Sequence, residues 1–106
     1  MEAPLEVDVT TAAELLRGGA LLLDVREPDE FAICRIAGSR ELPMRQVPEN
    51  LDALPRDTQI LALCHHGGRS MRVTQYLRAN GFTNATNVAG GIHAWAEQID
   101  TSLSRY

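Results

Sequence analysis

Segments typical of β-strands alternate with segments typical of helices along this chain, and that alternation is what most constrains its fold. Residues 20–25 and 59–63 are apolar runs of strand length, and residues 84–88 follow as a third strand segment. Residues 5–9 alternate apolar and acidic side chains, which predicts a short, half-exposed strand. Strands separated by helices pair in parallel and are covered on both faces. The order therefore predicts a three-layer α/β/α domain.

The helical segments between these strands are bounded by residues that start or end helices. The sequence Thr-Ala-Ala-Glu at 11–14 is a capping box, which predicts a helix start at Thr11, and the glycine pair at 18–19 ends that helix. We expect a short helix from Pro28, a longer one over 70–80, and a last one over 91–99 with Ile92, Trp95 and Ile99 facing inward.

Composition limits the classes of protein to which the chain can belong. Its 106 residues, 44% of them hydrophobic and 23% charged, are typical of one soluble globular domain with a loose polar tail at 100–106. The net charge of −4 disfavours nucleic acid as a partner. No apolar run approaches the roughly 20 residues of a membrane span. The two cysteines and the acidic start, which lacks a secretory leader, favour a reduced, cytoplasmic setting.

Cys64 is the chemically most informative residue, because it follows the apolar run 59–63 and precedes a glycine-containing loop and a helix. Ligands of parallel α/β sheets bind outside the carboxyl ends of the strands. Gly67 and Gly68 allow backbone amides to turn inward, and Arg69 adds a permanent positive charge. Such surroundings favour a thiolate, which makes Cys64 a candidate nucleophile. The alternative is a cysteine that only fills space in the core.

Three segments of the chain resemble the rhodanese family of single-domain sulfurtransferases: residues 22–31 (LLDVREPDEF), 64–70 (CHHGGRS) and 90–95 (GGIHAW). The resemblance implies a five-stranded parallel sheet with helices on both faces. It also implies that Cys64 is catalytic and carries a persulfide. The remaining loop residues would bind the substrate, namely His65, His66, Gly67, Gly68, Arg69 and Ser70.

The activity implied by this resemblance is transfer of a sulfane sulfur from thiosulfate, a polysulfide or a persulfide to cyanide or a thiol, with no metal or organic cofactor. A carrier that passes its persulfide to a sulfur-acceptor protein would use the same cysteine. A phosphatase or arsenate reductase on this fold has five residues between its cysteine and arginine. Here four residues separate Cys64 from Arg69, and this shorter loop favours sulfur chemistry.

Other polar residues near these motifs are expected to support the site without reacting. Asp24 and Arg26 end another predicted strand, and we expect them to form ion pairs and loop hydrogen bonds. Cys34 occupies a position where the family commonly has glycine. We expect a passive, partly buried thiol there, and the alternative is a resolving thiol that attacks the Cys64 persulfide.

Three histidines accompany these motifs. His65 occupies a position where many family members have arginine, so a strongly charged donor would be attracted less well; its ring either lines the pocket rim or faces outward. We expect His66 to be an ordinary loop residue and His93 to be structural. A metal site built from Cys64, His65 and His66 is disfavoured, because adjacent residues rarely converge on one ion.

Overall fold

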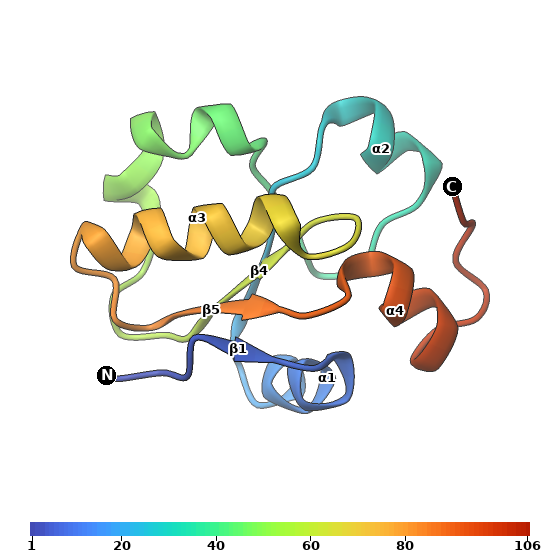
Figure 1. Ribbon diagram of the computed structural model, residues 1–106, viewed down its shortest axis with the longest axis horizontal. Coiled ribbons are helices and arrows are strands. Elements are labelled where there is room, and N and C mark those ends of the chain that lie inside the picture. The colour runs from blue at the N-terminus through green and yellow to red at the C-terminus, as the bar shows by residue number, and fades with distance from the viewer.

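A five-stranded parallel sheet runs through the middle of the computed structural model, which describes residues 1–106 (Figure 1). The strand order is β1-β5-β4-β2-β3, and every neighbouring pair is parallel. The strands are β1 Glu6–Val7, β2 Leu21–Asp24, β3 Arg40–Glu41, β4 Ile60–Leu63 and β5 Ala85–Val88. Strand β4 lies at the centre, so its carboxyl end is flanked by the parallel strands β5 and β2. This arrangement confirms the predicted three-layer fold.

Helices cover the two faces of the sheet in separate layers. The α-helices are α1 Val9–Arg17, α2 Pro28–Ile33, α3 Gly68–Ala79 and α4 Gly91–Gln98, and the 3-10 helices are η1 Met44–Gln46 and η2 Pro48–Ala53. Helices α1 and α4 pack on one face, whereas α3 packs on the other with residues from the 3-10 segments. No helix combines the length and the apolar character needed to cross a membrane.

The central strands supply both hydrophobic cores, because successive side chains point to opposite faces of a sheet. Leu22, Leu61 and Leu63 pack against α1 and α4, whereas Leu23 and Ala62 pack toward α3. All five side chains are fully buried. Full burial of one leucine stabilises a fold by about 1.5–3 kcal/mol, so the two cores hold β4 firmly in the middle of the sheet.

Two details of the helices differ from the predictions. Helix α1 begins at Val9 because the Asp8 carboxylate accepts a hydrogen bond from the Thr11 amide at 2.9 Å. Thr11 therefore lies inside the helix, and the predicted capping box was wrong. Ile92 and Trp95 are buried as expected, but Ile99 follows the end of α4 and is 37% exposed.

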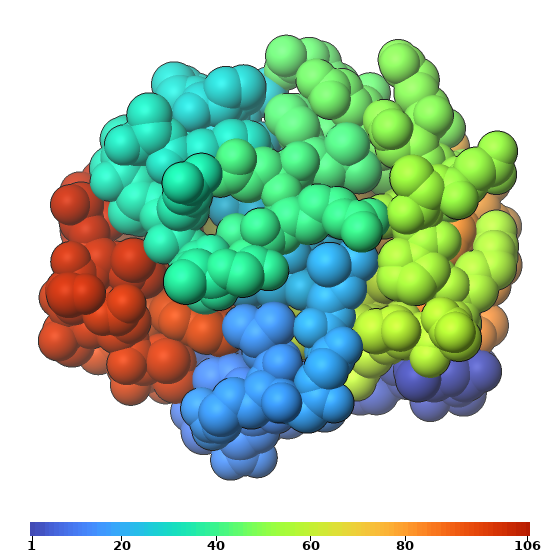
Figure 2. Space-filling view, turned by 180° about the vertical axis from the view of Figure 1, so that it is seen from behind, coloured from blue at the N-terminus to red at the C-terminus, as the bar shows by residue number.

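The edge strand and the C-terminal segment also depart from expectation. Strand β3 has only two residues, both exposed, so no apolar pattern marked it in the sequence. Residues 100–106 form no helix or strand, but some of them contact the rest of the domain. Leu103 packs against the core beside α4, and the Tyr106 hydroxyl donates to Glu30. Figure 2 shows this C-terminal segment, in red, beside the cyan segment that contains α2.

Candidate active site

Cys64 lies directly after β4 with three hydrogen-bond donors aimed at its sulfur. Its Sγ accepts from the Gly67 amide at 3.1 Å, the Ser70 amide at 3.4 Å and the Ser70 hydroxyl at 3.2 Å. The residue is only 1% exposed. Burial alone would suit a space-filling cysteine, but three converging donors form a cradle that stabilises negative charge on sulfur.

The loop adopts this shape because Gly67 has a φ of +108°, which side chains with a Cβ rarely adopt. A Cβ at this position would also approach the Gly90 nitrogen to 3.3 Å. The Gly67 carbonyl accepts a hydrogen bond from the Asn87 side chain at 3.2 Å. Asn87 is a positioning residue that was not among the predicted site residues, although an asparagine inside the predicted strand 84–88 was a usable signal.

The N-terminus of α4 is joined to the Cys64 loop through main-chain hydrogen bonds. The Ile92 amide donates to the Cys64 carbonyl at 2.8 Å, and the His93 amide donates to the His65 carbonyl at 3.0 Å. A Cβ on Gly91 would lie 2.5 Å from the Cys64 carbonyl oxygen, so only glycine permits this approach. The Gly90-Gly91 pair thereby fixes the position of the loop relative to α4.

Arg69 belongs to the Cys64 loop, but its positive charge is paired. Its Nη1 and Nη2 donate to the two carboxylate oxygens of Glu30 at 2.6 and 2.9 Å. The Arg69 hydrogen bonds are the main cause that lowers the pKa of Glu30 from 4.5 to about 2, against the opposing effect of burial. Glu30 was not among the predicted site residues, because its partner is 39 residues away in the sequence.

Asp24 and Arg26 form a fully buried ion pair with each other. Arg26 Nε donates to Asp24 Oδ1 at 2.9 Å, and Nη2 donates to Asp24 Oδ2 at 2.7 Å. The remaining Arg26 donors reach the Cys34 carbonyl at 2.8 Å and the Tyr106 hydroxyl at 3.0 Å. The pair therefore ties the segment after α2 to the C-terminus, which is the ion-pairing expected of these residues.

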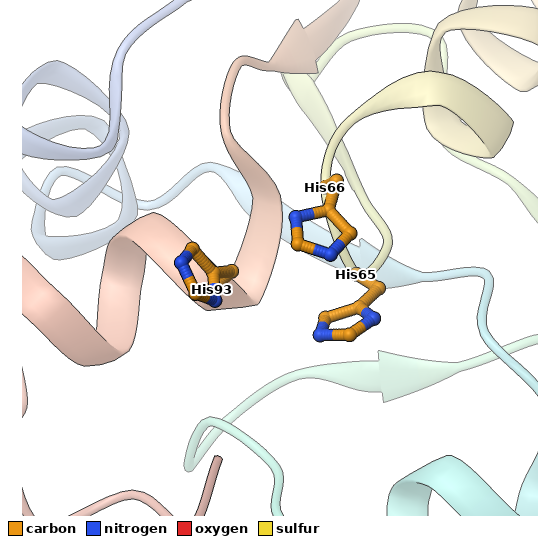
Figure 3. Close-up of side chains that lie close together, drawn as sticks. All are labelled: His65, His66 and His93. Carbon is orange, nitrogen blue, oxygen red and sulfur yellow. The ribbon is translucent and has the colours of Figure 1, made fainter. Parts of the chain in front are cut away.

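His65 is partly buried, whereas His66 is exposed. The Tyr106 ring stacks on the His65 ring, with centroids 3.8 Å apart and planes inclined by 11°. Burial lowers the pKa of His65, and the neighbouring His66 lowers it further. His93 is carried by α4 and lies beside these two residues, as Figure 3 shows. Its ring centroid is 5.0 Å from that of His66 and 6.2 Å from that of His65.

Cys34 is a free, partly buried thiol on the same side of the molecule. It lines a small pocket together with His65, His93 and Tyr106. Its role as a passive or a resolving thiol stays a prediction.

The fold and the cradle define an α/β protein with a cysteine loop at the carboxyl edge of a parallel sheet. The model of the rhodanese-like domain matches residues 8–98. This chain belongs to the rhodanese-like sulfurtransferase family, which confirms the resemblance seen in the sequence.

Single-domain relatives match most of the chain. A protein named sulfurtransferase from Allochromatium vinosum is 37% identical over 76 residues, covering 72% of this chain and 71% of the relative. The thiosulfate sulfurtransferase GlpE of Ectopseudomonas mendocina is 32% identical over 84 residues, covering 79% and 77%. The structure of the human single-domain sulfurtransferase TSTD1 superimposes with a TM-score of 0.83 at 27% identity, covering 91% of this chain and 98% of the human chain.

Other relatives are much longer than this chain. A chloroplastic Rhodanese-like/PpiC domain-containing protein from Arabidopsis thaliana is 37% identical over 91 residues. The match covers 82% of this chain but only 30% of that relative. The domain thus occurs both alone and within larger proteins.

Proposed function

We propose that this protein is a sulfurtransferase that carries a sulfane sulfur as a persulfide on Cys64. The observation that carries the proposal is the convergence of the Gly67 amide and both Ser70 donors on Cys64 Sγ. Donors at this position stabilise the attacking thiolate and, after transfer, the negative charge of the persulfide. His65, His66, Gly68 and Arg69 complete the wall of the substrate site.

The reaction has two half-reactions that share the persulfide. In the first, the Cys64 thiolate attacks the outer sulfur of the donor; a sulfur–sulfur bond forms to Sγ, and the donor's own sulfur–sulfur bond breaks. With thiosulfate, sulfite leaves with the bonding electron pair. In the second, cyanide or a thiolate attacks the outer sulfur, and the electron pair of the broken bond returns to Cys64. Thiocyanate or a new persulfide leaves.

The charges at the rim favour a donor less charged than thiosulfate. Arg69 is neutralised by Glu30, and burial lowers the pKa of His65, which favours its neutral form. A dianion therefore meets little unpaired positive charge at the rim. We propose a less charged persulfide as the preferred donor, with the dianion thiosulfate as a poorer one.

Intact-mass analysis after treatment with thiosulfate or polysulfide tests the proposal. The native chain should gain the mass of one sulfur atom, and cyanide should remove it. The Cys34→Ser variant should behave like the native chain, whereas Cys64→Ser should gain nothing. A gain that persists in Cys64→Ser and is lost in Cys34→Ser would assign the chemistry to the other thiol and overturn the proposal.

Turnover distinguishes an enzyme from a protein-to-protein carrier. Appreciable rates with a polysulfide and a small thiol support the enzyme. Persulfide exchange that requires an acceptor protein would instead identify a carrier, and rapid hydrolysis of an aryl phosphate would identify a phosphatase.

A further inference from the structure

All three histidines of the chain meet at one place beside the catalytic loop. His65 and His66 come from the loop after β4, and His93 comes from the first turn of α4 (Figure 3). One ring nitrogen of each lies within 4.8 Å of the others. Histidines 65 and 93 are 28 positions apart in the sequence, so the fold, not local sequence, brings the third ring to the other two.

We propose that His65, His66 and His93 bind a divalent first-row transition-metal ion, of which Zn²⁺ is the representative. Imidazole nitrogen suits Zn²⁺, Co²⁺, Ni²⁺ and Cu²⁺, whereas Mg²⁺ and Ca²⁺ prefer oxygen ligands. Three protein ligands leave one position of a tetrahedral ion open to water or another ligand. The proposal goes beyond sulfur transfer and does not depend on it.

A main-chain hydrogen bond holds the loop that carries His65 and His66 next to α4, which carries His93. The hydrogen bond from the His93 amide to the His65 carbonyl, at 3.0 Å, joins the backbones of two of the ligands. Tyr106 stacks on His65 and limits the movement of that ring. The backbones of His65 and His93 are therefore held together, and an ion can bind without rearrangement of the backbone.

Only small side-chain rotations are needed to close the site around an ion. Bonds of about 2.0–2.1 Å to a tetrahedral Zn²⁺ place ligand nitrogens about 3.4 Å apart. The ring nitrogens now lie within 4.8 Å of one another, so they must approach by up to about 1.4 Å. His66 is exposed and the His93 side chain is 40% exposed, so both rings have space to turn.

A carboxylate stands next to one of the ligands. Glu97 Oε1 lies 3.5 Å from His93 Nε2, one helical turn further along α4. Imidazoles that bind metals commonly donate their other ring N–H to a carboxylate, which fixes the orientation of the ring. Glu97 is placed to do this for His93 and adds a negative charge near the cation.

Calorimetric titration with Zn²⁺ tests the site in a Cys34→Ser/Cys64→Ser background, where no thiol can bind the ion. We expect one equivalent to bind, and no binding of Mg²⁺. His93→Ala in that background should weaken binding by at least about tenfold, since even outer partners of metal ligands contribute 10–100-fold. Gln98→Ala, an exposed neighbour on α4, should leave the affinity unchanged.

A second variant and a second readout guard against a folding defect. His66→Ala alters an exposed side chain and should weaken Zn²⁺ binding as His93→Ala does. Circular dichroism establishes that each variant is folded, and the visible absorption of bound Co²⁺ should be reduced in both histidine variants relative to the background. The proposal is overturned if Zn²⁺ does not bind in the background, or if both folded histidine variants bind it as tightly as Gln98→Ala.

Discussion

Ser70 provides two of the three donors around Cys64, one from its main chain and one from its side chain. It is fully buried in the first turn of α3, where its carbonyl also accepts a hydrogen bond from Thr74. The residue therefore links the reactive sulfur to a helix that is packed on the sheet. One short side chain thus contributes both to the candidate site and to the fold.

Replacing Ser70 by alanine should slow persulfide formation by about tenfold to a hundredfold. The change removes the hydroxyl donor and keeps the amide, and a hydrogen bond to a charged group is worth about 1.5–3 kcal/mol. Single-turnover kinetics with polysulfide measures the effect. Thr74→Val, in the next turn of α3, controls for packing because it leaves every donor to the sulfur in place. An unchanged rate in Ser70→Ala would show that the hydroxyl is dispensable.

Glu30→Gln should improve the use of thiosulfate by releasing the Arg69 charge toward the dianion. Because the pair is partly exposed, we expect the KM for thiosulfate to fall by about twofold to fivefold, with a weaker effect at high salt. Steady-state kinetics at two ionic strengths measures this change. Glu27→Gln removes an equivalent charge at the start of α2 but leaves Arg69 paired, so its KM should not change. A higher KM in Glu30→Gln would mean that the pair itself holds the donor.

The junction between the Cys64 loop and α4 tolerates little change, since Gly91 has a φ of +60° and leaves no room for a Cβ. Gly91→Ala should destabilise the fold by about 2–4 kcal/mol and reduce sulfur transfer, because the loop and the helix must separate. Denaturant unfolding measures the free energy. Gly68→Ala is the matched control, because its Cβ would meet nothing within 4 Å. Equal stability of the two variants would contradict this account of the junction.

Most elements could be predicted from the sequence because their signals are local. Strands β2 and β4 are each marked by a run of consecutive apolar residues. The Cys64 loop is also one continuous segment. The cap of α1 was misplaced because Asp8 and Thr11 are both competent caps, and only their packing decides between them. The pairing of Glu30 with Arg69 and the closeness of His93 to His65 and His66 could not be predicted, because these neighbours come from distant segments that a linear pattern does not connect.

At the scale of the whole molecule, Glu30 joins three parts of the chain that are far apart in sequence. Its carboxylate accepts from Arg69 at the start of α3 and from the Tyr106 hydroxyl at 2.7 Å, while it belongs to α2. The C-terminal segment therefore packs over the same edge of the sheet as the site. Loss of this carboxylate's charge should loosen all three parts together.

Acid should destabilise the native protein through Glu30. Its pKa is about 2 in the fold against 4.5 for an ordinary glutamate, so the unfolded chain binds more protons between these values. The contribution of the Glu30 carboxylate to the free energy of unfolding is complete above pH 4.5 and is lost as the pH falls toward 2. After allowance for solvent screening we expect about 1 kcal/mol. Denaturant unfolding across this range should show a smaller loss in Glu30→Gln than in the native chain; parallel curves would contradict the assignment.

Because Cys64 is 1% exposed, almost none of its thiol meets solvent, whereas the sulfur it acquires would extend beyond it. A thiol so little exposed would be reached more readily by a donor with a slender, linear end than by a branched one. The loaded protein would then present to its acceptor the transferred atom and almost nothing of the residue that bears it. Donor and acceptor would thus meet the protein through a single atom.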